Sequence, residues 1–153
     1  MSLAIGQQAP DFSLPNYDRS KVSLSDLKGH KAVIVFIPFA FTGVCEGELC
    51  AIRDDLKGLE NLGAKVVVIT CNAAPSNGAW AKSQGFEFPI LADFWPHGAV
   101  TQAYGAFNDA LGCPNRFSFV LDREGAIREI MSTDSLGAAR SHAAYAAALE
   151  GIA

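Results

Sequence analysis

The sequence predicts an α/β fold in which a central mixed sheet is covered by helices on both faces. Residues 32–37 and 65–70 are short, mainly apolar runs with the length of buried strands. An amphipathic helical pattern lies between them, and this order implies a right-handed parallel crossover. Two further strand-like runs, at 117–122 and 126–131, are joined by a glycine-containing turn, which predicts an antiparallel hairpin.

The other elements follow from local patterns of apolar, turn-forming and small residues. A polar turn between two short extended runs predicts a β-hairpin near the N-terminus, and the main helix begins near Val44 and ends at about Leu62 and Gly63. In chain order, the remaining predictions are strands at 12–15 and 22–24, a helical connector at 25–29, a helix at 75–84, an extended piece at 88–91, a short helix at 98–104 and an alanine-rich helix at 136–149.

The length and composition of the chain restrict its organisation and its partners. With 153 residues, half of them hydrophobic, residues 1–153 are predicted to form one domain with a full core. The net charge of −4, without a run of lysine or arginine, argues against nucleic acid or a membrane surface as a partner. No stretch approaches the length of a membrane span, and the first residues do not resemble a signal peptide, so we expect a cytoplasmic protein.

The chain changes from an apolar strand to an amphipathic helix between residues 37 and 50. Pro38 ends the strand because proline has no N–H to donate, and Cys45 falls in the first turn of the helix. Unpaired backbone N–H groups and the positive end of the helix dipole favour a thiolate at this position. We therefore predict that Cys45 is a nucleophile; the alternative is a buried structural cysteine.

Pro38, Thr42 and Cys45 form the pattern P-x-x-x-T-x-x-C, and Arg116 precedes a predicted strand. In these features the sequence resembles the peroxiredoxins, which are thiol-dependent peroxidases, and residues 93–105 are most similar to the AhpE subgroup. The resemblance covers nearly the whole chain. It implies a thioredoxin-like fold with an added N-terminal β-hairpin, and an antioxidant oxidoreductase that reduces hydrogen peroxide or organic hydroperoxides and serves cell redox homeostasis.

Peroxide reduction requires a thiolate together with hydrogen-bond donors for two oxygen atoms. Arg116 is expected to supply positive charge and a fork of donors, although an arginine paired at a strand edge is the alternative. The Thr42 hydroxyl can donate and accept at once, and it can also cap the helix. Pro38 is expected to pack over Cys45, and Glu48 to hold Arg116 in place unless it is simply a solvated carboxylate.

After the reaction Cys45 becomes a sulfenic acid that must be reduced. Cys50 completes the spacing T-x-x-C-x-x-x-x-C of the bacterioferritin-comigratory class of peroxiredoxins, in which the second cysteine resolves the first. Cys113, on a predicted loop near Arg116, is a second candidate, whereas Cys71 ends a buried strand and is expected to be a core thiol. The AhpE resemblance implies instead an external reductant, which is a thioredoxin-, glutaredoxin- or mycoredoxin-like protein or a low-molecular-weight thiol.

Other functions remain as alternatives. The chain has no C-x-x-C pair and its histidines are scattered, so we expect no metal and no other cofactor. A thioredoxin-like disulfide carrier would need a cysteine where Thr42 stands, and a redox-sensing or chaperone-like binding protein would use Cys45 as a switch without turnover. The apolar residues that flank the site can line a bulky-peroxide pocket or a dimer interface, and the resemblance favours a homodimer; they are Phe39, Phe41, Phe94 and Trp95.

Overall fold

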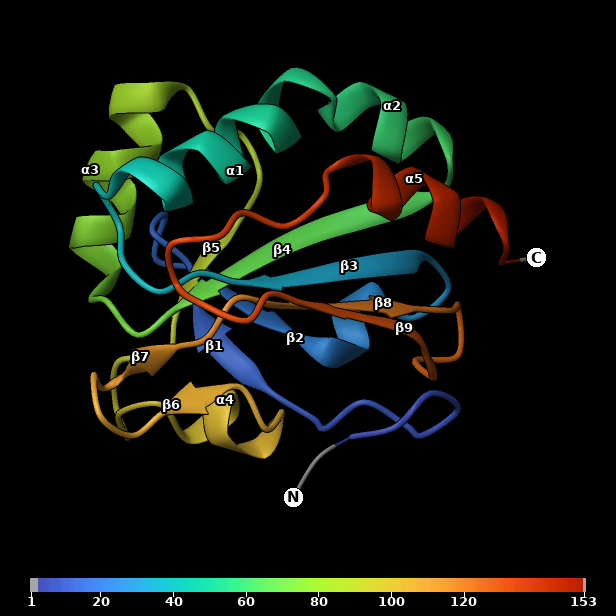
Figure 1. Ribbon diagram of the computed structural model, residues 1–153, viewed down its shortest axis with the longest axis horizontal. Helices are drawn as coiled ribbons and strands as arrows, with labels where there is room; N and C mark the ends of the chain where they lie inside the picture. The colour runs from blue at the N-terminus through green and yellow to red at the C-terminus, as the bar shows by residue number, and fades with distance from the viewer. Residues whose placement is uncertain (1–2, 153) are drawn as a thin grey trace.

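The structure is a computed structural model in which residues 3–152 are described. Its central sheet has the strand order β5-β4-β3-β8-β9 (Figure 1). Strand β3 (Lys31–Phe36) lies in the middle, parallel to β4 (Ala64–Thr70) and antiparallel to β8 (Phe117–Leu121). Strands β5 (Ile90–Ala92) and β9 (Ile127–Ser132) form the two edges. The predicted mixed sheet and its parallel crossover are therefore confirmed.

Each face of the sheet packs against its own layer (Figure 1). Alternate side chains of β3 point to opposite faces, so Val33 and Val35 belong to one core cluster and Ile34 and Phe36 to the other. The first face is covered by α1 (Gly43–Asp54), α2 (Leu56–Asn61), α3 (Ala74–Gln84) and α5 (Ala143–Glu150). The second is covered by the predicted hairpin of β1 (Ser13–Pro15) and β2 (Lys21–Ser23), the 3-10 helix η1 (Leu24–Leu27) and α4 (Ala99–Ala103).

The long helix predicted after Cys45 is two helices, because α1 ends before Asp55 and α2 begins after it. Asp55 has φ −112° and ψ 13°, which is not helical. Its carboxylate occupies the space where a Cβ on Gly58 would stand, and Oδ2 lies 2.9 Å from Nε2 of His142. The contact with His142 is long-range, and the apolar periodicity does not reveal the break.

The prediction of a final helix over 136–149 is wrong in its first half, since α5 begins only at Ala143. The carbonyl oxygen of Leu136 accepts a bond of 2.7 Å from Nε of Arg116, and the backbone N–H of Arg140 donates to Oε2 of Glu48 at 2.8 Å. These long-range bonds use backbone groups that a helix would have paired internally. Residues 136–142 therefore run as an irregular segment toward α1.

Two shorter elements also differ from the prediction. The extended piece expected at 88–91 is strand β5, which is shifted to Ile90–Ala92. The pair β6 (Phe107–Asn108) and β7 (Cys113–Pro114) was not predicted, because two-residue strands have no detectable period. As a result Cys113 lies in a strand and is fully buried, rather than on an open loop.

Candidate active site

Cys45 lies in the first turn of α1, just beyond the carboxyl end of β3, and its residue surface is 0% exposed. Reactive groups of α/β sheets gather at this end of parallel strands. The first intrahelical bond of α1 runs from the N–H of Glu46 to the carbonyl of Thr42. The N–H groups of Val44 and Cys45 precede that bond and are free of intrahelical acceptors, so they are available to a substrate oxygen.

Arg116 makes the direct contact with the sulfur, because its Nη2 lies 3.3 Å from Sγ of Cys45. Its Nη1 donates to Oε1 of Glu48 at 2.6 Å, and its Nε donates to the carbonyl oxygen of Leu136. The side chains of Arg116 and Glu48 are only 4% and 6% exposed. The structure thus brings Cys45, Arg116 and Glu48 together, and Glu48 is not a solvated carboxylate.

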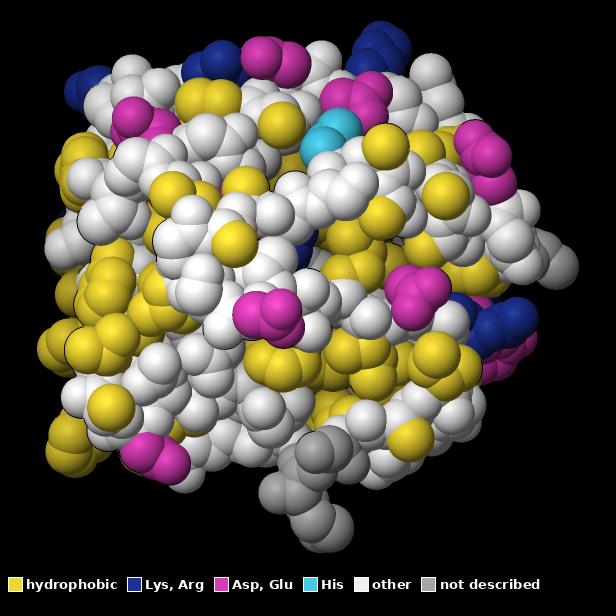
Figure 2. Space-filling view, in the orientation of Figure 1, with side chains coloured by type: hydrophobic (Ala, Val, Ile, Leu, Met, Phe, Trp, Pro, Cys, Tyr) yellow, Lys and Arg dark blue, Asp and Glu magenta, His cyan; other side chains and the backbone are white. Residues whose placement is uncertain are grey.

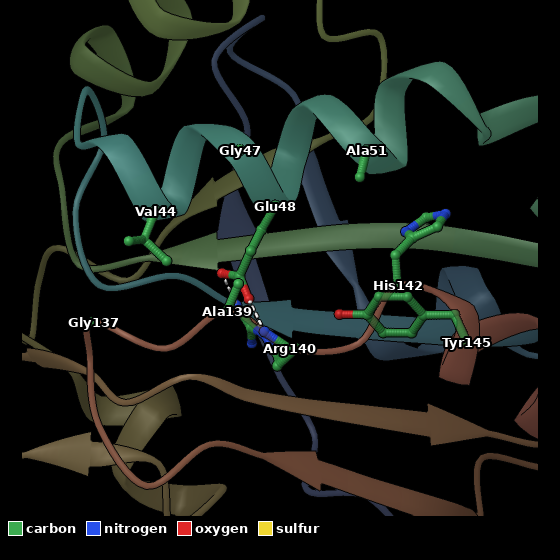
Figure 3. A pocket seen from close by; sticks show the side chains of 9 residues that line it. All are labelled: Val44, Gly47, Glu48, Ala51, Gly137, Ala139, Arg140, His142 and Tyr145. Atoms are coloured by element: carbon green, nitrogen blue, oxygen red, sulfur yellow. Dashed lines mark hydrogen bonds and ion pairs between the residues drawn. The ribbon is translucent and has the colours of Figure 1, made fainter.

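Arg140 is the residue of this cluster that the sequence analysis missed. Its Nη2 and Nε donate to the two carboxylate oxygens of Glu48 at 2.8 and 2.9 Å (Figure 3). Its Nη1 donates to the carbonyl oxygens of Phe36 and Phe117 at 2.8 and 2.7 Å. The one arginine in the alanine-rich stretch 136–149 was the available signal, but that stretch was predicted only as a helix that packs on the sheet.

The charges of the cluster sum to zero when the cysteine is a thiolate. Arg116 and Arg140 contribute two positive charges, and Glu48 contributes one negative charge. Burial alone would raise the pKa of Glu48, but hydrogen bonds and charge from Arg140, together with the charge of Arg116, hold that pKa below its ordinary value. Glu48 therefore stays ionised, and the remaining positive charge faces Cys45.

Thr42 and Pro38 border the same turn. Thr42 is the N-cap residue of α1, but its side chain makes no capping bond, and the hydroxyl donates to the carbonyl oxygen of Phe39 at 2.8 Å. Its oxygen therefore keeps a lone pair with which to accept a hydrogen bond. Pro38 is buried and follows Ile37, whose N–H donates to the carbonyl oxygen of Ile69. The expected packing of Pro38 over Cys45 stays a prediction.

The other three cysteines have different surroundings, and all four thiols are free. Burial raises the pKa of Cys71 to about 11, with its thiol 3.7 Å from the Thr101 hydroxyl, so it is a core thiol as predicted. Burial, with a smaller effect of the neighbouring Cys45, raises the pKa of Cys113. Cys50 is half-buried, with its sulfur 3.8 Å from Oε1 of Gln84 on α3.

A cavity of about 260 Å³ lies beside the Glu48–Arg140 pair, between α1 and α5 (Figure 3). Small residues leave this space open, including Gly47 and Ala51 on α1 and Ala139 on the irregular segment. Cys45 is not among the residues that line this cavity. Within residues 3–152, no group of three or more His, Cys, Asp or Glu side chains is placed to hold a metal ion.

We predict that Glu48→Gln lowers the free energy of unfolding at pH 7 by about 3 to 5 kcal/mol, because two buried guanidinium groups lose their shared counter-charge. The folded-state pKa of Glu48 is lowered from 4.5, so its contribution is complete above that pH and is lost as pH falls through the lowered value. The difference between variant and wild type should therefore shrink below pH 4.5.

Urea unfolding at several pH values measures this difference. Glu60→Gln, on the exposed side of α2, is the matched control and should stay within about 0.5 kcal/mol of wild type. A Glu48→Gln penalty that does not change with pH would contradict the ionised, charge-paired state of this carboxylate.

Comparisons with known proteins identify the family of this chain. The family model described as AhpC/TSA family matches residues 5–130. Alkyl hydroperoxide reductase E of Mycobacterium tuberculosis is 48% identical over 127 residues, which cover 82% of this chain and 83% of the relative. Peroxidoxin BcpB of Mycobacterium tuberculosis superposes with a TM-score of 0.85 at 28% identity, over 97% of both chains. Enterococcus faecalis AhpC has a TM-score of 0.87 at 27% identity, over 98% of this chain and 92% of its own. The chain therefore belongs to the AhpC/TSA family, and it is a peroxiredoxin with a thioredoxin-like fold and thiol-dependent peroxidase activity.

Proposed function

We propose that Cys45 is the peroxidatic nucleophile of this enzyme and that its substrates are hydrogen peroxide and organic hydroperoxides. The contact of 3.3 Å between Nη2 of Arg116 and Sγ of Cys45 carries this assignment. The name of the mycobacterial relative, an alkyl hydroperoxide reductase, supports alkyl hydroperoxides as one substrate class.

In the proposed reaction the Cys45 thiolate attacks one peroxide oxygen, the O–O bond breaks, and its electron pair leaves with the other oxygen. The products are a sulfenic acid on Cys45 and, after the departing oxygen takes a proton, water or an alcohol. Arg116 and the N–H groups at the start of α1 donate to the two oxygens, and the Thr42 oxygen accepts a hydrogen bond from the peroxide O–H. The attacked oxygen keeps its hydrogen in the sulfenic acid, and the departing oxygen takes a proton from water. Glu48 holds Arg116 in this orientation, and Pro38 limits the access of water.

Arg116→Lys tests the main assignment, because lysine keeps the charge but loses the fork that reaches sulfur and oxygen together. We expect the second-order rate constant with hydrogen peroxide to fall by about 10²- to 10³-fold. Alkylation of Cys45 by iodoacetamide, which needs a thiolate but no donors for peroxide oxygens, should fall much less.

Stopped-flow oxidation and alkylation rates, compared in one preparation, separate these effects. Cys45→Ser is the inactive control and should show no oxidation by peroxide. Cys71→Ala, which changes another buried cysteine, should keep the wild-type peroxide rate. Residual peroxidase turnover in Cys45→Ser would refute the nucleophile, and a wild-type peroxide rate in Arg116→Lys would refute the donor role.

We further propose that an external thiol reduces the sulfenic acid of Cys45 in two steps. The first thiol forms a mixed disulfide with Cys45 and releases water. A second thiol then attacks the sulfur of the first, forms a disulfide with it and releases the Cys45 thiolate. Candidate reductants are a thioredoxin-, glutaredoxin- or mycoredoxin-like protein and low-molecular-weight thiols. A cytoplasmic location, where thiols stay reduced, accords with the four free cysteines. In residues 3–152 no helix is both long and apolar enough to cross a membrane.

Cys50 and Cys113 are the two internal candidates for a resolving thiol. In an intact α1, residues five apart have Cα atoms roughly 8 to 9 Å from each other. A disulfide needs less than about 7 Å, so Cys50 can resolve Cys45 only if the first turns of α1 unwind. Burial raises the pKa of Cys113, which disfavours the thiolate that would attack.

We therefore expect Cys50→Ser and Cys113→Ser to turn over at the wild-type rate with dithiothreitol as the reductant. Peptide mapping after one equivalent of peroxide should find a sulfenic acid on Cys45, with the far-UV circular dichroism unchanged. A bridge from Cys45 to Cys50 with partial loss of helix, or a bridge to Cys113, would show an internal resolving thiol instead.

We also propose a homodimer formed through the apolar end of the molecule near Cys45. Figure 2 shows hydrophobic side chains along the edge where α1 begins and where β6 and β7 lie. Large exposed residues come from the segments at this end, namely Phe39, Phe41, Phe94, Trp95 and Leu111. An apolar patch of this kind marks an interaction site more often than a free surface.

Trp95→Glu should shift the protein toward monomers in sedimentation experiments, because Trp95 is 83% exposed and a carboxylate there would be desolvated in a dimer. Ile5→Glu is the matched control, since Ile5 is also exposed, at 62%, but outside this patch. A wild-type protein that is monomeric at all accessible concentrations would contradict the proposal.

A further inference from the structure

A hydrogen-bonded chain links the active-site cluster to helix α5, which does not touch the reacting atoms. Nη1 of Arg140 donates to the Ser118 hydroxyl at 3.2 Å, and this hydroxyl lies 2.8 Å from the phenolic oxygen of Tyr145. Ser118 is 0% exposed and Tyr145 is 3% exposed. In Figure 3, the hydroxyl end of Tyr145 points from α5 toward Arg140, and Glu48 reaches Arg140 from α1 on the other side.

The hydrogen-bond donors of Arg140 explain how the Ser118 and Tyr145 hydroxyls can orient its guanidinium group. Nη1 carries two hydrogens and has three acceptors within reach: the carbonyl oxygens of Phe36 and Phe117, and the Ser118 hydroxyl. A guanidinium group only donates, so the Ser118 oxygen accepts from it. The two carbonyl oxygens are fixed by the sheet. The Ser118 hydroxyl is therefore the one member of this acceptor set whose direction α5 can influence, through its bond to Tyr145.

We propose that Tyr145 and Ser118 are positioning residues for peroxide reduction. Their paired hydroxyls orient Arg140, Arg140 holds both oxygens of Glu48, and Glu48 holds Arg116 against the Cys45 sulfur. This inference rests on the proposed role of Cys45 and Arg116. Neither hydroxyl contacts a reacting atom, so both act through Arg140.

A purely structural explanation is that the two hydroxyls only satisfy each other in an apolar core. Buried hydroxyl groups do require partners, and a paired serine and tyrosine meet that requirement. The bond from Arg140 to Ser118 is what ties this pair to the active site. The two explanations differ in their consequence for rate, because only the positioning role slows the chemistry when the pair is broken.

Tyr145→Phe removes the hydroxyl and keeps the ring, and we expect the rate constant for Cys45 oxidation by hydrogen peroxide to fall by about 5- to 20-fold. This is less than the ~10²-fold cost of a 1 Å misplacement of a reacting group, since the effect of Tyr145 reaches the sulfur only through other side chains, four of them in sequence: Ser118, Arg140, Glu48 and Arg116. Tyr104→Phe is the matched control. Tyr104 is 1% exposed and donates to the carbonyl of Pro10 in the core on the other face of the sheet.

Both tyrosine variants lose a buried hydrogen bond, so both should lower the melting temperature, but only Tyr145→Phe should lower the peroxide rate. If Tyr145 acts through Ser118, then Tyr145→Phe should cause no further loss of rate in a Ser118→Ala background. Equal rates in Tyr145→Phe and Tyr104→Phe, or independent multiplicative effects of Ser118→Ala and Tyr145→Phe, would overturn the positioning role.

The wild-type protein distinguishes this failure from a failure of the proposed function. If Cys45 is not the peroxidatic residue, the wild type itself will show no oxidation by peroxide that Cys45→Ser abolishes. If only the positioning role is wrong, wild-type Cys45 will be oxidised normally, and Tyr145→Phe will match it in rate.

Discussion

The carboxylate of Glu48, shared by two guanidinium groups, is the interaction on which the rest of the site depends. Each of its oxygens accepts bonds from arginine donors, and all three side chains are almost fully removed from water. A buried cation without a partner is costly, so the three groups must stay together in the folded protein. Their net charge is positive, and Nη2 of Arg116 lies 3.3 Å from the Cys45 sulfur. The contacts that keep the buried charges paired therefore also hold a guanidinium group against this sulfur.

The fold holds this arrangement between two rigid elements. Strand β3 lies in the middle of the sheet with both faces covered, and α1 begins a few residues after its end. Cys45 belongs to the core cluster on the helical face, together with Leu49 and Tyr145. Cys45 is therefore part of the packed interior, and its position is determined by the same contacts that stabilise the fold.

The sequence motif was sufficient to name the groups that touch the sulfur or border it. Cys45, Thr42 and Pro38 lie within one turn and its approach, and Glu48 follows Cys45 by three residues on α1, which places them on neighbouring positions of one helix. Arg140 was not found, because its segment was predicted to be a helix. An arginine in a regular surface helix would be solvated, whereas here the irregular backbone carries it into the core.

The sequence by itself determined the elements whose signals are local: the apolar strands, the start of α1 near Cys45, and the two hairpins. It also determined that Cys45 lies at a helix start, where the free backbone N–H groups depend only on neighbouring residues. Only the tertiary structure decided where the last helix begins and which cations share Glu48. Arg140 and Glu48 are 92 residues apart, and their bonds replace those of a helical turn. Which of the local and distant hydrogen bonds form is decided only when the chain has folded. A short segment of sequence therefore cannot predict the outcome.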